Sequence, residues 1–221
     1  MNEHSFPGSD VSLNSITTAR RAADERRERI LEAAERAFAA HGFHAATMQD
    51  VAEAAGMSAG NLYRTFPSKE AIVEGLCARD QQERAANFAK LEGVDSVMAA
   101  FAAGLRDHVV ARPRAKATLM VEIWAEAARN PAVAAMSRAV DADILAQLER
   151  MIEVAKQRGE ASPSVDSPSV ARFIFTYVCG LLQRRACDPE LDADAECERA
   201  FGLVKALCEG ALSPVAAESS R

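Results

Sequence analysis

The chain has 221 residues, enough for one or two domains, and its apolar content of 49% with only 5% aromatic residues is typical of an all-helical protein. A formal net charge of −6 excludes a protein that attracts nucleic acid through a broad positive field. Residues 1–70 carry 8 basic and 10 acidic groups, and residues 71–221 carry 18 and 22. Any binding of nucleic acid must therefore depend on a few placed contacts.

Residues 1–23 are polar, contain Pro7 and Gly8, and show no sustained hydrophobic period, which predicts a flexible arm. Arg20 and Arg21 lie at the end of this arm. They allow two interpretations. The arm touches DNA phosphates or a minor groove, or it is a solvated helix start whose charge is offset by the acidic residues that follow.

Apolar residues recur at helical spacing from about residue 24 to residue 40, before Gly42. A second helix should begin after Thr47, an N-cap with an acidic residue three positions later, and end at Gly56, since glycine adopts the left-handed conformation at little cost. Ser58 caps a third short helix, which Pro67 follows. The apolar residues expected to complete a three-helix core are Phe43, Met48, Val51, Met57, Leu62 and Phe66.

Two short helices joined by a tight turn form the layout of a helix-turn-helix motif, whose second helix enters a DNA major groove. Between Ser58 and Lys69 there is no acidic residue, and Arg64 and Lys69 are basic. The residues at the start of this helix are small, so its backbone can approach a phosphate or a base edge. The same spacing also suits an ordinary helical hairpin with a polar outer face.

Residues 25–75 resemble, without a gap, the N-terminal domain of TetR-type transcriptional regulators. The resemblance is carried by residues 30–38, 41–43 and 47, and by residues 50–70 with the pattern Ala-Gly-x-Ser-x-Gly-x-Leu-Tyr-x-x-Phe-x-x-Lys-Glu. It implies a homodimer that binds double-stranded DNA at an inverted-repeat operator. It also implies a repressor that a small-molecule inducer releases from DNA.

The resemblance assigns roles to single residues of the motif. Thr47 should contact a phosphate, and Tyr63 and Lys69 should clamp phosphates. Arg64 is the candidate for a bidentate contact to guanine, with a phosphate contact as the alternative. The predicted DNA-binding residues are Thr47, Ser58, Ala59, Gly60, Asn61, Tyr63, Arg64, Thr65 and Lys69.

Helical patterns continue through the rest of the chain, and no strand alternation is present. They lie at about residues 68–91, 95–111, 115–129, 131–158, 168–186 and 193–211. The predicted fold class is therefore all-α, with about nine helices. The predicted domains are a helix-turn-helix DNA-binding domain (24–70), a helical ligand-binding and dimerisation domain (71–212) and a tail (213–221).

By resemblance, the last two helices pair with those of a second copy, and the wide apolar face at residues 173–182 supports this. The predicted interface residues are Phe173, Tyr177, Leu181, Phe201, Val204 and Leu207. An apolar ligand pocket is expected in the same domain, although for each candidate side chain alone plain core is the more common role. The candidates are Phe101, His108, Met120, Trp124, Phe175, Thr176 and Cys179.

The sequence contains no nucleophile elbow, phosphate-binding loop or metalloprotease motif, so we expect no enzyme, no catalytic or metal-binding residues and no cofactor. Cys197 and Cys208 are three helical turns apart, with Cys179 and Cys187 on the preceding helix. A thiol or soft-metal sensor is therefore an alternative function. A second is a helical small-molecule-binding protein whose DNA target is weak or lost.

The five cysteines are an odd number without a Cys-x-x-Cys pair, which indicates reduced thiols. No apolar run approaches the roughly 20 residues of a membrane span, and the N-terminus lacks a signal-peptide pattern. We therefore expect a soluble, cytoplasmic protein without a membrane partner.

Overall fold

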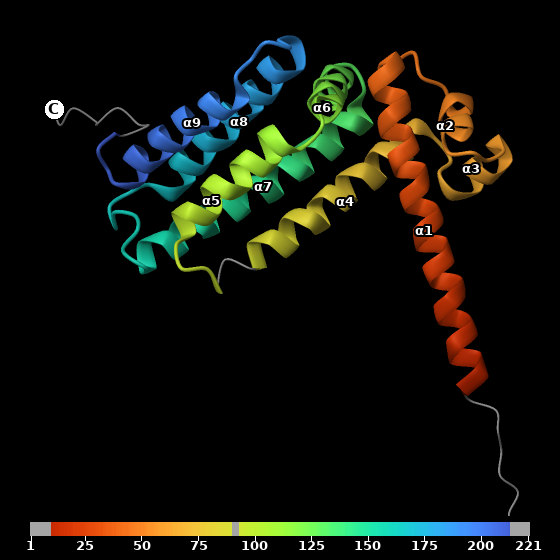
Figure 1. The fold of residues 1–221 in the computed structure, drawn as a ribbon, viewed down its shortest axis with the longest axis horizontal. Coiled ribbons are helices and arrows are strands. Elements are labelled where there is room, and N and C mark those ends of the chain that lie inside the picture. Colours follow the sequence, from red (N-terminus) through yellow and green to blue (C-terminus); the bar gives the residue numbers. More distant parts are fainter. Residues whose placement is uncertain (1–9, 90–92, 213–221) are drawn as a thin grey trace, which may run out of the picture.

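The computed structural model describes residues 10–89 and 93–212, and every regular element in these ranges is helical. The elements are α1 (Asp10–His41), α2 (Met48–Ala54), α3 (Ala59–Thr65), α4 (Lys69–Ala89), α5 (Val97–Arg106), the π-helix η2 (Asp107–Ala111), α6 (Arg114–Ala127), α7 (Pro131–Gln157), α8 (Ser167–Cys187) and α9 (Ala193–Cys208). α2 and α3 lie beside α1, and α4 leads from them to a bundle of the later helices (Figure 1). The predicted all-α fold is confirmed.

α1 is longer than the sequence pattern indicated. A flexible arm was predicted for residues 1–23, whereas α1 begins at Asp10 and continues to His41. The prediction was therefore wrong for residues 10–23, and residues 1–9 lie outside the described part of the chain. No glycine or proline interrupts the sequence between Asp10 and His41, so a helix can continue even where it has no apolar stripe to bury.

The first three helices enclose a core, as the sequence predicted. Ile30 and Phe38 of α1 are completely buried, and so are Val51 of α2 and Leu62 of α3. Five of the six predicted core residues are buried, and the sixth, Met57, is partly buried against the same cluster. This core holds α2 and α3 against one side of α1 (Figure 1).

The same core continues past residue 70, the predicted domain boundary. Leu119 and Ile123 of α6 belong to it. α4 approaches it closely at Gly75, where an added Cβ would lie 2.9 Å from the ring of Phe66 and 3.0 Å from Leu31. A side chain at this position would push the helices apart. The three-helix unit is therefore packed directly against α4 and α6.

The helix predicted for residues 95–111 changes its hydrogen bonding before its end. α5 is followed by a π-helical turn, Asp107–Ala111, in which the N–H of Arg112 donates to the carbonyl of Asp107 at 3.2 Å. Arg185 of α8 donates to the carbonyls of Val110 at 3.1 Å and Arg112 at 2.8 Å, which satisfies acceptors at this helix end. The π-helical turn also fixes the position of His108, a predicted pocket residue.

The later helices surround two further apolar clusters. One contains Ile152 of α7 and Ile174 of α8, and the other contains Val109 and Leu182. α8 packs against α6, α7 and α9 and is the central helix of the bundle. Within residues 10–89 and 93–212, no helix combines the length and the hydropathy of a bilayer span.

Candidate functional site

The turn into α2 is fixed by the capping box that the sequence predicted. The N–H of Asp50 donates to the hydroxyl of Thr47 at 3.1 Å, and the Asp50 carboxylate accepts from the N–H of Thr47 at 2.7 Å and from its hydroxyl at 2.8 Å. These bonds, the backbone bond first, hold the pKa of Asp50 below its usual value. Thr47 is exposed at the start of α2, and its contact with a phosphate stays a prediction.

The first turn of α3 exposes backbone donors. Ser58 is the N-cap, and its hydroxyl oxygen accepts from the N–H of Asn61 at 3.4 Å. The N–H groups of Ala59 and Gly60 lie in the first turn, where a helix offers no carbonyl partner. An added Cβ at Gly60 would meet no atom within 4 Å, so the backbone here is accessible from outside. Such a helix start suits a phosphate group.

The second turn of α3 carries the larger polar side chains. Tyr63 is 51% exposed, which is unusual for a large aromatic residue. Arg64 donates to the side-chain oxygen of Asn61, and the Thr65 hydroxyl donates to the Asn61 carbonyl at 3.5 Å. Arg64 and Asn61 are both exposed and already face each other, so a base edge or a phosphate could bind both together.

The Lys69 ammonium binds backbone carbonyls of its own chain. Its Nζ donates to the carbonyls of Phe43 at 2.8 Å, His44 at 3.0 Å and Ala46 at 2.9 Å, and lies 4.9 Å from the centre of the Phe43 ring. An ammonium has three N–H groups, and three carbonyls take them. Lys69 therefore holds the turn between α1 and α2 in place. A direct contact with phosphate, which stays a prediction, would require it to leave a carbonyl.

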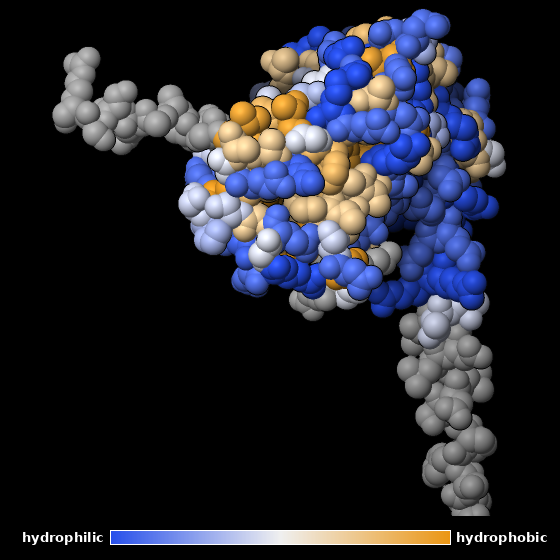
Figure 2. Space-filling view, turned by 60° about the vertical axis from the view of Figure 1, so that its left-hand side comes forward, coloured by the Kyte–Doolittle hydropathy of each residue, from blue (hydrophilic) through white to orange (hydrophobic). Residues whose placement is uncertain are grey.

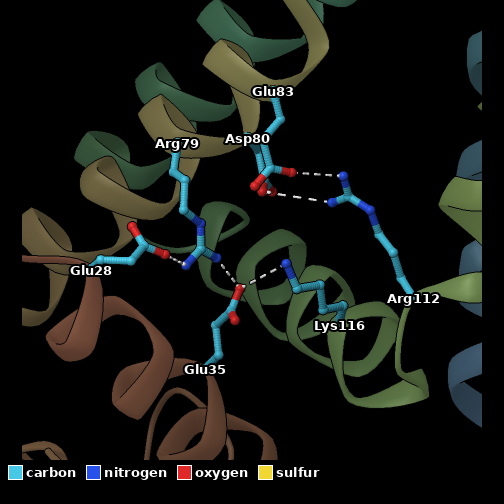
Figure 3. A network of polar contacts seen from close by, with 7 residues as sticks. All are labelled: Glu28, Glu35, Arg79, Asp80, Glu83, Arg112 and Lys116. Atoms are coloured by element: carbon cyan, nitrogen blue, oxygen red, sulfur yellow. Dashed lines mark hydrogen bonds and ion pairs between the residues drawn. The ribbon is translucent and has the colours of Figure 1, made fainter. Parts of the chain in front are cut away.

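A cluster of ion pairs joins α1 to α4 and α6 (Figure 3). Arg79 of α4 donates to Glu28 at 2.8 Å and also to Glu35, both on α1, while Lys116 of α6 lies 3.3 Å from Glu35. Arg79 is 13% exposed and Glu35 is 20% exposed. Burial acts to lower the pKa of Arg79, but the bond to Glu28 and the charge of Glu35 outweigh it and raise that pKa.

The cluster continues from α4 to the end of the π-helix. Arg112 donates to Glu83 at 2.9 Å and lies 3.7 Å from Asp80 (Figure 3). Neither half of this cluster is predicted from the sequence. Its members are far apart along the chain, and each one alone looks like an ordinary charge on a solvated helix face.

α6 also contacts the turn before α2 directly. The Glu122 carboxylate accepts from the N–H of Phe43 at 3.1 Å, and the carbonyl of Phe43 accepts from Lys69. A Cβ added at Gly42 would lie 3.2 Å from the same carboxylate. A shift of α6 would therefore act on the turn that positions α2.

A cavity of about 50 Å³ lies between α4, the π-helix, α6 and α8. Two of the predicted pocket residues, His108 and Met120, line it together with Cys77, Asp80 and Arg112. This volume suits one or two water molecules, so a larger ligand would require the helices to move.

The other predicted pocket residues lie elsewhere in the described part of the chain. Phe101 and Trp124 pack against the apolar cluster around Val109, and Phe175 packs against the cluster around Ile174. Thr176 is exposed, and Cys179 is partly buried. The structure brings only His108 and Met120 together at a cavity, and ligand contact by any of the seven stays a prediction.

The predicted dimer residues divide into two groups. Leu181, Val204 and Leu207 are at most 4% exposed in a single chain, so they pack the core beneath the outer surface. The other three, Phe173, Tyr177 and Phe201, are partly exposed. Leu203 of α9, which the sequence analysis did not single out, is 38% exposed. The interface itself stays a prediction.

Four of the five cysteines are not activated for thiol chemistry. Burial raises the pKa of the Cys77, Cys197 and Cys208 thiols, and burial followed by the charge of Asp141 raises the pKa of Cys179 to about 11. Cys197 and Cys208 lie in separate apolar clusters. A raised pKa leaves little thiolate at these four residues, so none of them supports the alternative of a thiol sensor.

The burial of His108 at this cavity can be tested through the pH dependence of protein stability. Burial, and then the charge of Arg112, lowers the pKa of His108 to about 4. The unfolded chain therefore binds a proton in a pH range where the folded chain does not. The free energy of unfolding should fall by about 2 kcal/mol between about pH 7 and pH 5 through this residue alone. Urea unfolding of the His108→Gln variant should lack this part of the pH dependence.

His44→Gln is the matched control, because His44 is exposed. Comparing the two variants at each pH separates the effect of the substitution itself from the effect of its place at the cavity. Equal pH profiles for the parent and His108→Gln would show that His108 is not buried in its neutral form.

Comparison with known proteins identifies both parts of the chain. The family model described as "Bacterial regulatory proteins, tetR family" matches residues 30–76, and the model "BetI-type transcriptional repressor, C-terminal" matches residues 98–212. The first match covers the helix-turn-helix motif described above. The second covers more than half of the chain, from α5 to the residues after α9.

Individual relatives agree with these matches. The HTH-type transcriptional regulator UidR of Escherichia coli K12 is 35% identical over 159 residues, which cover 71% of this chain and 79% of UidR. The HTH-type transcriptional repressor AcnR of Corynebacterium diphtheriae is 28% identical over 187 residues, which cover 81% of this chain and 90% of AcnR. The solved structure of Salmonella enterica GusR matches with a TM-score of 0.70 and 32% identity, covering 84% of this chain and 96% of GusR. The chain therefore belongs to the TetR family and is a DNA-binding transcriptional regulator.

Proposed function

We propose that the protein is a homodimeric repressor that binds an inverted-repeat operator and leaves it when a small molecule binds the C-terminal domain. The observation that carries the proposal is the exposed, acid-free face of α3, where free backbone N–H groups, Tyr63 and the Arg64–Asn61 pair lie together. The name of its relative AcnR, a transcriptional repressor, supports the direction of regulation.

Binding to an inverted repeat requires a dimer, because each half-site takes one recognition helix and the two half-sites lie one or more duplex turns apart. Figure 2 shows apolar residues gathered on the face of the molecule that lies away from α1. Leu203 of α9 is exposed and Phe201 and Tyr177 are partly exposed, which supports pairing through α8 and α9. Exposed apolar patches of this kind are typical of protein interfaces.

Release by a ligand is supported by the contacts between the two halves of the chain. A ligand that enlarges the cavity beside His108 must displace α4, α6, α8 or the π-helix. Two of these helices contact the DNA-binding unit directly, α6 through Glu122 and α4 through Arg79. Binding of ligand and binding of DNA would then be coupled equilibria.

Variants of α3 test the DNA contacts on an operator that the wild-type protein selects from a random DNA pool. Tyr63→Phe should weaken binding to every selected sequence about equally, by roughly three- to tenfold, because it removes one hydrogen bond to phosphate. Arg64→Ala should relax the preference at one base position by about 1–3 kcal/mol. Binding measured against single-base variants of the operator distinguishes the two effects.

Arg138→Ala is a suitable control, because Arg138 is an exposed arginine of α7. It should leave both affinity and preference unchanged. The assignment of the contacts would be wrong if both α3 variants bound like the control. The proposed function would be wrong if the wild-type protein enriched no sequence.

A further inference from the structure

The N-terminal part of α1 extends beyond the three-helix core (Figure 1). Residues 17–29 are all exposed, and the next residue, Ile30, is completely buried. At 1.5 Å per residue, the part of α1 before Ile30 is about 30 Å long. A helical segment with few tertiary contacts is only marginally stable in water, so this segment is suited to a partner that it contacts.

The charges of this segment are separated into two sides. Successive residues of an α-helix are about 100° apart, so Arg20, Arg26, Arg27 and Arg29 occupy one half of the circumference. The acidic residues Asp24, Glu25 and Glu28 occupy the other half.

The acidic half is largely used within the chain. Glu28 accepts from Arg79 of α4 at 2.8 Å, and Glu25 accepts from Arg21 at 3.1 Å. On the basic half, Arg20, Arg26 and Arg29 form no ion pair with any residue that the structure describes. Three guanidinium groups are therefore available to an anionic partner.

The basic half begins beside the recognition helix. The guanidinium carbon of Arg27 lies 4.6 Å from the centre of the Phe66 ring, and Phe66 is the C-cap of α3. This contact places the basic half of α1 beside the C-terminal end of α3. The chain as a whole carries a net charge of −6, so a local basic surface at this place stands out as a candidate contact for an anionic partner.

We propose that residues 17–29 of α1 are a second DNA-contact segment, in which Arg20, Arg26 and Arg29 bind phosphates outside the base pairs that α3 reads. The inference rests on the proposed function. A helix with its side chains is about 10–12 Å across and the minor groove about 6 Å wide, so the segment lies along the backbone and does not enter that groove.

The test is the triple variant Arg20→Gln, Arg26→Gln and Arg29→Gln, measured on the operator that the wild-type protein selects. Three lost phosphate contacts per protomer should make the slope of log affinity against log salt shallower by about five for a dimer. Affinity at about 0.1 M salt should fall at least tenfold. Glutamine has nearly the helix propensity of arginine, so circular dichroism should stay unchanged.

The matched control is the triple variant Arg138→Gln, Arg150→Gln and Arg172→Gln. It removes the same charge from three exposed arginines of α7 and α8, which form no ion pair among the described residues. It should keep the wild-type salt slope. Hydroxyl-radical footprints should show flanking phosphates that the wild type and the control protect and the α1 variant does not.

An unchanged slope and footprint for the α1 variant, with normal binding by the wild type, would overturn this inference and leave the proposed function intact. Equal losses in both triple variants would overturn it as well, because they would reflect bulk charge. A wild-type protein that selects no DNA would overturn the proposed function, and this inference with it.

Discussion

Replacing Phe66 by alanine should lower the free energy of unfolding by about 3–5 kcal/mol and abolish binding to the selected operator. Phe66 is 2% exposed and ends α3, and its ring contacts the point at which α4 passes Gly75. Removing the ring leaves a cavity between α1, α3 and α4 that these helices cannot close without losing other contacts. Thermal and urea unfolding, followed by a DNA-binding measurement on the same samples, would record both losses.

Tyr63→Ala is the matched control for this experiment. It removes an aromatic side chain of similar size from the same helix, but from a position that is 51% exposed. Its stability should stay within about 0.5 kcal/mol of the wild type, while its affinity for DNA falls. If Phe66→Ala were as stable as Tyr63→Ala, the ring of Phe66 would not be part of the core.

Local rules predicted the DNA-binding unit well because its signals are short-range. The capping box at Thr47, the turn at Gly56 and the cap at Ser58 are each determined by a few neighbouring residues, and all three are confirmed. Gly56 adopts a φ of +65°, which is the left-handed conformation that a glycine was expected to supply. Apolar spacing then identified the core that these turns enclose.

The failures have a different origin. α1 was predicted to begin at Asp24, because the apolar pattern of the sequence begins near there. Residues 17–23 of the helix before it are exposed, so the sequence shows no periodic apolar pattern in that part. The end of the π-helix after α5 is stabilised by Arg185 of α8, which donates to the carbonyl of Val110. No local sequence rule predicts a contact between residues so far apart in the chain. For α1 the first part of the helix was missed because these residues are exposed. For the π-helix the missing information was a contact between distant parts of the chain.

The DNA-binding residues and the pocket residues were not equally easy to predict, for the same reason. Residues of α3 could be assigned from the motif, whereas the pocket residues were chosen by residue type alone. Trp124 and Phe101 are partly buried and pack against an apolar cluster, whereas Glu122 contacts Phe43 of the DNA-binding unit. Composition can identify an apolar helix, but it cannot distinguish a side chain that lines a cavity from one that fills it.

Replacing Arg79 by methionine should be the second large effect, with a loss of about 3 kcal/mol in the free energy of unfolding. The substitution keeps the apolar stem but removes the guanidinium that lies between Glu28 and Glu35. Glu35 is only 20% exposed, and it would then have Lys116 at 3.3 Å as its remaining ion-pair partner. Urea unfolding at low and high salt measures the loss, which salt should change little because the pair is mostly buried.

The double variant Arg79→Met with Glu35→Met shows whether the loss comes from the broken ion pair. With both charges gone, no carboxylate is left poorly paired between α1 and α4, and an apolar pair of similar size is often as stable as a buried ion pair. The double variant should therefore be more stable than Arg79→Met alone. Arg21→Met, at an exposed pair with Glu25, should behave like the wild type. Equal instability of the single and double variants would mean that packing of the Arg79 stem, and not its charge, joins α1 to α4.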